Sequence, residues 1–62
     1  MAKGTIVSFH KDQPICFVED DELKEKVLIR RTKAFSINDR VVYQRISSST
    51  GLVGVRVKKL QK

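Results

Sequence analysis

Residues 13–18 read QPICFV, a proline followed by four apolar residues, and this stretch decides how the rest of the chain is interpreted. Proline lacks a backbone N–H, so Pro14 belongs in a turn or at the first position of a strand. Successive side chains of a strand point to opposite faces. We therefore expect Cys16 and Val18 to point into a core, while Ile15 and Phe17 point to the other face.

Four more segments are rich in β-branched and alternating apolar residues and are separated by turn-forming residues. They are residues 4–9 (GTIVSF), 26–31 (KVLIRR), 40–46 (RVVYQRI) and 52–60 (LVGVRVKKL). At most one helical turn is expected, near residues 32–35. Short strands close together predict one all-β domain over residues 1–62, a small five-stranded antiparallel barrel, because closure removes exposed strand edges. The expected core includes Val18, Val27, Ile29, Val41, Tyr43 and Val57.

The net charge of +6 is unevenly distributed. Residues 19–25 hold five of the seven acidic residues and one lysine, a local charge of −4, whereas the remainder carries twelve Lys or Arg against Asp12 and Asp39, a charge of +10. We interpret the acidic run as a solvated hairpin. The basic remainder favours a polyanion such as nucleic acid, or an acidic protein surface. The alternative is that the excess of lysine and arginine is ordinary solvated surface.

Several classes of protein are disfavoured. A single cysteine cannot form an internal disulfide and fits a reducing compartment, so a cytoplasmic protein is expected. One Cys and one His cannot build a structural zinc site, and no apolar run approaches the roughly 20 residues that span a membrane. No pair of nucleophile and base is evident, so we expect neither catalysis nor a cofactor. Cys16 is predicted to be a buried, poorly reactive hydrophobe, and the chain to be a monomer.

The order of residues resembles the cold-shock domain family. Residues 3–10 (KGTIVSFH) resemble that family's opening KGTVKWFN, and residues 13–18 and 26–31 fall where it has the RNA-binding motifs KGFGFI and DVFVHF. Residues 37–43 (INDRVVY) are similar to its EGQxVxF, and residues 51–60 to its final KGPxAxNVxxL. The family's binding tryptophan is Ser8 here, and Ile15, Leu28, Arg30 and Arg31 replace its phenylalanines and histidine.

The resemblance implies an OB-fold barrel that binds single-stranded RNA or DNA by stacking bases on aromatic side chains beside basic ones. Of Arg30 and Arg31, which alternate in direction, Arg30 is the better candidate for the binding face. The exchange of aromatic residues for arginine and aliphatic residues predicts binding that is weaker and more salt-sensitive than that of an aromatic-rich family member. The candidate nucleic-acid-binding residues are Phe9, His10, Lys11, Ile15, Phe17, Leu28, Arg30, Arg31, Phe35, Arg56 and Lys58.

The sequence therefore supports two hypotheses about function. In the first, the chain binds single-stranded RNA or DNA with little sequence preference. In the second, the barrel keeps its fold, but Ile15, Phe17 and Leu28 form an aliphatic patch that docks a protein partner. The basic charge favours the first and the low count of aromatic residues favours the second. Phe9 and Phe17 could also be ordinary core residues.

Overall fold

In the computed structural model, residues 1–49 and 51–60 are described, and they form five β-strands and no helix. The strands are β1 (Ala2–Phe9), β2 (Ile15–Asp20), β3 (Lys26–Arg30), β4 (Arg40–Ser48) and β5 (Gly51–Lys59). All five predicted strands are confirmed, with small shifts at their ends. Residues 32–35 make only a tight turn, in which the Phe35 N–H donates to the Thr32 carbonyl at 3.2 Å.

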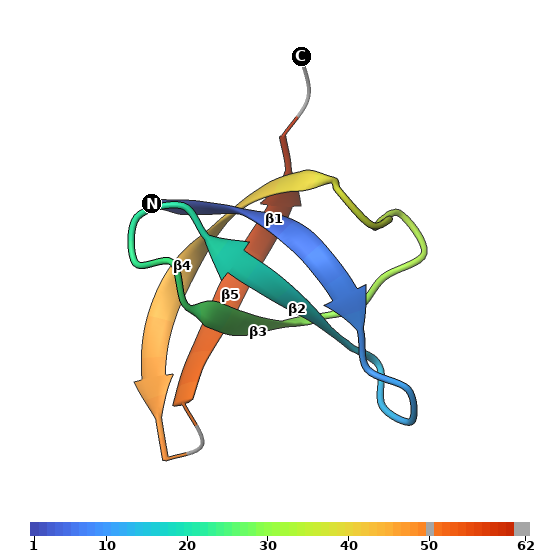
Figure 1. The fold of residues 1–62 in the computed structure, drawn as a ribbon, viewed down its shortest axis with the longest axis horizontal. Coiled ribbons are helices and arrows are strands. Elements are labelled where there is room, and N and C mark those ends of the chain that lie inside the picture. The colour runs from blue at the N-terminus through green and yellow to red at the C-terminus, as the bar shows by residue number, and fades with distance from the viewer. Residues whose placement is uncertain (50, 61–62) are drawn as a thin grey trace.

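The strands close into a barrel in the order β1-β2-β3-β5-β4, with β4 pairing back onto β1 (Figure 1). Four of the seams are antiparallel, but β3 and β5 pair in parallel, with Leu28 beside Val53. The predicted small five-stranded all-β barrel is confirmed, with this one seam parallel and the other four antiparallel. Because β5 follows β4 as a hairpin and β4 is antiparallel to β1, β5 must run in the same direction as β1 and β3. The architecture is an OB-like barrel.

The barrel interior follows the predicted alternation. Cys16 and Val18 of β2 and Val27 and Ile29 of β3 are buried. Ile6, Val41 and Tyr43 complete the centre, while Phe9, Phe35, Leu52 and Val57 pack against it and are only partly buried. Burial raises the pKa of the Cys16 thiol, although the nearby charge of Arg31 acts in the opposite direction. The raised pKa and the burial together favour the unreactive thiol form.

Two irregularities change which side chains face outward. In β1 the register shifts between Ile6 and Ser8, so Ser8 lies opposite Phe17 and Phe9 lies opposite the inward-facing Cys16. In β5 the register shifts again. Val42 of β4 pairs with Lys58 and Gln44 pairs with Val55, so β5 has one residue more than β4 between these two pairs. Arg56 lies in this second bulge with a left-handed backbone, φ 53°. Regular alternation, which would send Arg56 and Lys58 to the same side, is interrupted there.

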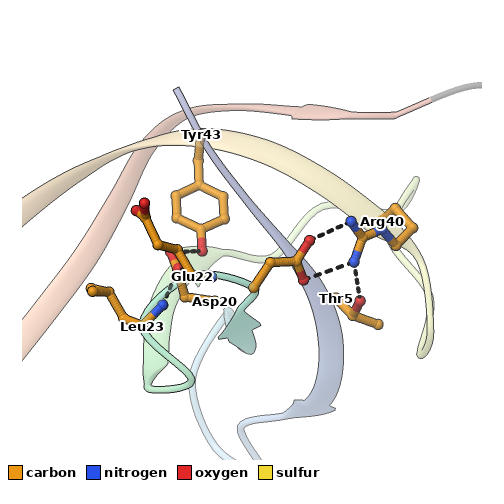
Figure 2. Close-up of polar contacts among 7 residues, drawn as sticks. Thr5, Asp20, Glu22, Leu23, Arg40 and Tyr43 are labelled. Atoms are coloured by element: carbon orange, nitrogen blue, oxygen red, sulfur yellow. Dashed lines mark hydrogen bonds and ion pairs between the residues drawn. The ribbon is translucent and has the colours of Figure 1, made fainter.

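The acidic hairpin between β2 and β3 is not simply solvated, because Asp20 is fully buried. Its carboxylate accepts hydrogen bonds from the Tyr43 hydroxyl at 2.7 Å and from the backbone N–H groups of Glu22 and Leu23 at 2.9 and 3.0 Å (Figure 2). Arg45 lies 3.5 Å from Asp20 and donates to Glu22 at 2.7 Å. The prediction of a solvated hairpin is therefore wrong at Asp20.

A second ion pair fixes the same hairpin to the barrel wall. Arg40 of β4 donates to both carboxylate oxygens of Asp21 and, at 2.8 Å, to the Thr5 hydroxyl of β1 (Figure 2). The Asp21 backbone N–H donates to the Lys3 carbonyl. The hydrogen bonds from Arg40 lower the pKa of Asp21 below its ordinary value. The hairpin is thus held by cations that the chain itself supplies.

Candidate nucleic-acid interface

All of the candidate residues except Phe9 and Lys58 lie on the β2–β3 face or along the two depressions beside it. Figure 1 shows the acidic hairpin on the left of the barrel, while the β1–β2 loop and the β3–β4 loop both lie on the right. The two loops on the right meet, because the Arg31 backbone N–H donates to the Pro14 carbonyl at 2.8 Å. The outer surface of β2 and β3 runs from the acidic hairpin to these two loops.

The outer face of β2 and β3 brings together four of the predicted residues. Ile15 pairs with Arg30, and Phe17 pairs with Leu28. The core residues Cys16, Val18, Val27 and Ile29 occupy the alternate positions on these strands. Because partners in a sheet point to the same side, all four candidates point outward, as predicted for Ile15 and Phe17. Ser8 joins this face through its pairing with Phe17.

The two loops enclose an open groove of about 500 Å³ beside this face. His10, Lys11, Arg31 and Phe35 line the groove, and Asp12 is the acidic residue among its lining. His10 also has a structural role, since its Nδ1 accepts hydrogen bonds from the backbone N–H groups of Asp12 and Gln13 at 3.0 and 3.1 Å. Its ring centroid lies 6.1 Å from that of Phe17. The groove is therefore continuous with the β2–β3 face.

Phe9 does not share the outward face with Phe17. The bulge in β1 turns it to the side of Cys16, where it packs against the core. The guanidinium carbon of Arg31 lies 4.4 Å from the centre of the Phe9 ring, a cation–π distance. Phe9 therefore follows the core alternative and contacts Arg31, while Arg30 faces outward with Phe17.

The two remaining candidates, Arg56 and Lys58, lie on β5. A second cleft, of about 340 Å³, is lined by Arg30, Phe35 and Arg56 together with Thr32, Gly54, Val55 and Val57. Phe35 lines both the groove and the cleft. Lys58 pairs with Val42 on the outer surface of β4 and β5 and lines neither depression, so the structure does not bring it together with the others.

The arginines divide into two groups. Arg40 and Arg45 form ion pairs with acidic side chains, as does Lys59. Within residues 1–49 and 51–60, by contrast, Arg30, Arg31 and Arg56 form no ion pair. The arginines that line the groove and the cleft are therefore the ones whose charge the described part of the protein leaves uncompensated by direct pairing.

Some lining residues were missed by sequence reasoning. Thr32 and Lys33 of the β3–β4 loop contribute to the groove, and Gly54 and Val55 of β5 contribute to the cleft. The parallel β3–β5 seam, which brings β5 beside Arg30, left no signal in the local pattern. Lys33 could have been found from charge alone, since it follows Arg31 closely in a basic run.

Comparisons with known proteins add no identification: no family model matches the chain, and no curated protein sequence matches it significantly. Within the described residues, no group of three or more histidine, cysteine, aspartate or glutamate side chains is arranged to hold a metal ion. The same residues contain no helix with the length and hydropathy needed to cross a membrane.

Proposed function

We propose that the protein is a module that binds single-stranded RNA or DNA with little sequence preference, similar in mode to a cold-shock domain and without catalysis or a cofactor. The observation that carries the proposal is the outward Phe17, which lies one strand from the unpaired Arg30 and beside a groove lined by Lys11 and Arg31. A partly exposed aromatic ring next to cations without ion pairs is the combination that binds single-stranded nucleic acid, through stacking of bases and attraction of phosphates.

The proposed mechanism has two steps. The unpaired cations first attract the phosphate backbone, and this contribution falls as salt rises because counterions are released on binding. A base then stacks on Phe17, a contact worth about 1–3 kcal/mol. Arg30 contributes to both steps, since a guanidinium plane can stack on a base and pair with a phosphate.

Low sequence preference follows from the same chemistry. Phosphate contacts fix the position of a strand but do not distinguish bases. Stacking tolerates every base, because every base has a π-face. The β2–β3 face offers Ile15, Phe17 and Leu28 beside Arg30, and of these only Arg30 carries hydrogen-bond donors in its side chain.

One observation favours the alternative, a protein-docking module. Phe17, Leu28, Val53 and Ile46 lie side by side in register across β2, β3, β5 and β4. Ile46 is 44% exposed. A continuous apolar row on the outside of a barrel is a common feature of protein interfaces. Nucleic-acid binding requires the charge of Arg30, whereas protein docking requires the apolar side chain of Ile46.

The test is a fluorescence titration of a labelled single-stranded oligonucleotide over a series of salt concentrations. Phe17→Leu keeps the apolar bulk but removes the aromatic plane, so affinity should fall by about 5- to 150-fold, the equivalent of one lost stacking contact. The slope of log affinity against log salt should not change. Arg30→Ala should weaken binding and reduce that slope by about 0.7, the contribution of one phosphate contact to single-strand binding.

Lys3→Ala is the matched control, because Lys3 is an exposed cation of β1 that lines neither the groove nor the cleft. It should leave affinity close to that of the wild type. Absence of binding at low salt, or equal affinities of the wild type, Phe17→Leu and Arg30→Ala, would refute the nucleic-acid function. Sensitivity of a protein interaction to Ile46→Ala would then support the docking function.

A further inference from the structure

The cleft between β3, β5 and the β3–β4 loop adjoins the β2–β3 face on which stacking is proposed, and the two share Arg30. The end of β3 supplies Arg30, the loop supplies Thr32 and Phe35, and β5 supplies residues 54–57. Its volume of about 340 Å³ lies at the lower end of the roughly 300–1,000 Å³ range of small-molecule sites.

The lining combines one aromatic ring with aliphatic side chains and two cations. Phe35, Val55 and Val57 form its apolar part, and Arg30 and Arg56 are exposed at it. None of the residues that line this cleft in the described structure is acidic. An apolar surface with an aromatic ring suits a flat heterocycle, and two uncompensated guanidinium groups suit an anion such as a phosphate.

Arg56 is held in an unusual conformation at this position. Its φ of 53° places a non-glycine residue in the left-handed region, which is uncommon and carries strain that the surrounding structure must sustain. The residue sits in the bulge where β5 has one extra residue relative to β4. Bulges often occur next to binding sites, where they redirect a side chain. Here the bulge coincides with the arginine that lines the cleft.

The wall formed by the β3–β4 loop is held in place before any ligand arrives. The Thr32 hydroxyl accepts a hydrogen bond from the Ala34 N–H at 3.3 Å, and the Lys59 ammonium group donates to the Ala34 carbonyl at 3.2 Å. Lys59 also pairs with Asp39 at 3.2 Å, and Asp39 accepts from the Ser36 N–H at 2.8 Å. Phe35 is therefore carried by a preorganised loop, which reduces the ordering cost of binding.

From these observations we infer that the cleft binds one nucleoside phosphate. The base lies against Phe35 and the aliphatic side chains of β5, and the phosphate pairs with Arg30 and Arg56. The ligand is either one nucleotide of a bound strand or a free nucleotide. In the first case the inference rests on the proposed function and extends the path of the strand from the β2–β3 face across β3 to β5.

The experiment is an NMR titration of ¹⁵N-labelled protein with adenosine 5′-monophosphate, with adenosine, with inorganic phosphate and with a single-stranded oligonucleotide. Two variants are compared. Arg56→Gly removes the cation and relieves the left-handed backbone. Lys24→Gly is its matched control, because Lys24 is also an exposed cation with a left-handed backbone, φ 58°, but lies in the acidic hairpin.

We expect the monophosphate to shift the amide signals of Thr32, Gly54 and Val55. Arg56→Gly should weaken this binding by about tenfold, the loss expected for one charge-assisted contact, while Lys24→Gly should bind as the wild type does. Adenosine and inorganic phosphate, each lacking half of the ligand, should bind more weakly than the monophosphate. Equal affinity for inorganic phosphate and the monophosphate, or no shift of these three amides, would overturn the inference.

The oligonucleotide arm separates this inference from the proposed function. Oligonucleotide binding that depends on Phe17 but not on Arg56, without binding of the monophosphate, would overturn the cleft and leave the proposed function standing. Monophosphate binding that depends on Arg56, without any oligonucleotide binding, would support the cleft as a site for free nucleotides and refute the single-strand function.

Discussion

At the scale of the single residue, Asp20 and Tyr43 form a polar contact inside an otherwise apolar barrel. Burial by itself raises the pKa of Asp20, but the N–H of Leu23, the Tyr43 hydroxyl, the N–H of Glu22 and the charge of Arg45 together hold it below its ordinary value. The net lowering means that the unfolded chain binds this proton more readily than the folded protein. The contribution of Asp20 to stability is therefore complete above its unfolded pKa of about 3.9 and is lost as pH falls toward the folded pKa.

We predict that Asp20→Ala lowers the free energy of unfolding at pH 7 by about 3–5 kcal/mol, because it leaves Arg45 without its buried partner and the Tyr43 hydroxyl without an acceptor. A chain of 62 residues has a total of roughly 3–9 kcal/mol, so this variant should lose at least about a third of its stability. Tyr43→Phe removes one hydrogen bond to a buried carboxylate and should cost about 1.5–3 kcal/mol. Urea denaturation followed by circular dichroism measures both. Equal midpoints for the two variants would contradict the central role of Asp20.

At the scale of the element, much of the barrel could be predicted because a strand has a period of two. The alternation that places Cys16 and Val18 inside also reaches Asp20, so its burial could have been predicted had the charge of the hairpin not suggested solvation. The bulges could not be predicted, since no residue type marks them at Val7 or at Arg56. The bulge in β1 turns the Phe9 side chain to the side of the inward-facing Cys16. The parallel pairing of β3 with β5 forms a cleft between segments far apart in sequence.

A prediction for β5 concerns Gly54, which lies against the core. A Cβ atom added there would lie 2.8 Å from Ile29 Cγ2 and 3.0 Å from Tyr43 Cδ2, closer than side chains normally approach. Gly54→Ala should therefore lower the free energy of unfolding by about 1–3 kcal/mol through overpacking. Lys58→Ala, an exposed change on the same strand, should stay within about 0.5 kcal/mol of the wild type. Chemical denaturation checks both, and a wild-type midpoint for Gly54→Ala would show that the barrel can widen at this seam.

At the scale of the whole molecule, charge is arranged along the barrel. The acidic hairpin lies at one end, where Arg40 and Arg45 compensate part of its charge. Arg31 lines the groove between the β1–β2 and β3–β4 loops, and Arg30 and Arg56 line the cleft beside the β3–β4 loop. Figure 1 shows both loops on the side of the barrel opposite the acidic hairpin. In the proposed function, this arrangement orients a polyanion toward the loops before any contact forms.

The orientation effect predicts a specific response to salt in the double variant Glu19→Gln/Glu25→Gln. Both side chains are exposed on the acidic hairpin or next to it. The longest dimension of the molecule is 31 Å, comparable to the Debye length of about 30 Å at 0.01 M salt and far beyond the value of about 3 Å at 1 M.

Removing the two charges should raise the rate of oligonucleotide association about twofold at 0.01 M, since each interaction across the barrel is small in water. At 1 M the variant and the wild type should associate at the same rate. Stopped-flow fluorescence measures the rates. An equal enhancement at both salt concentrations would mean that the hairpin contacts the strand directly, contrary to its placement away from the proposed interface.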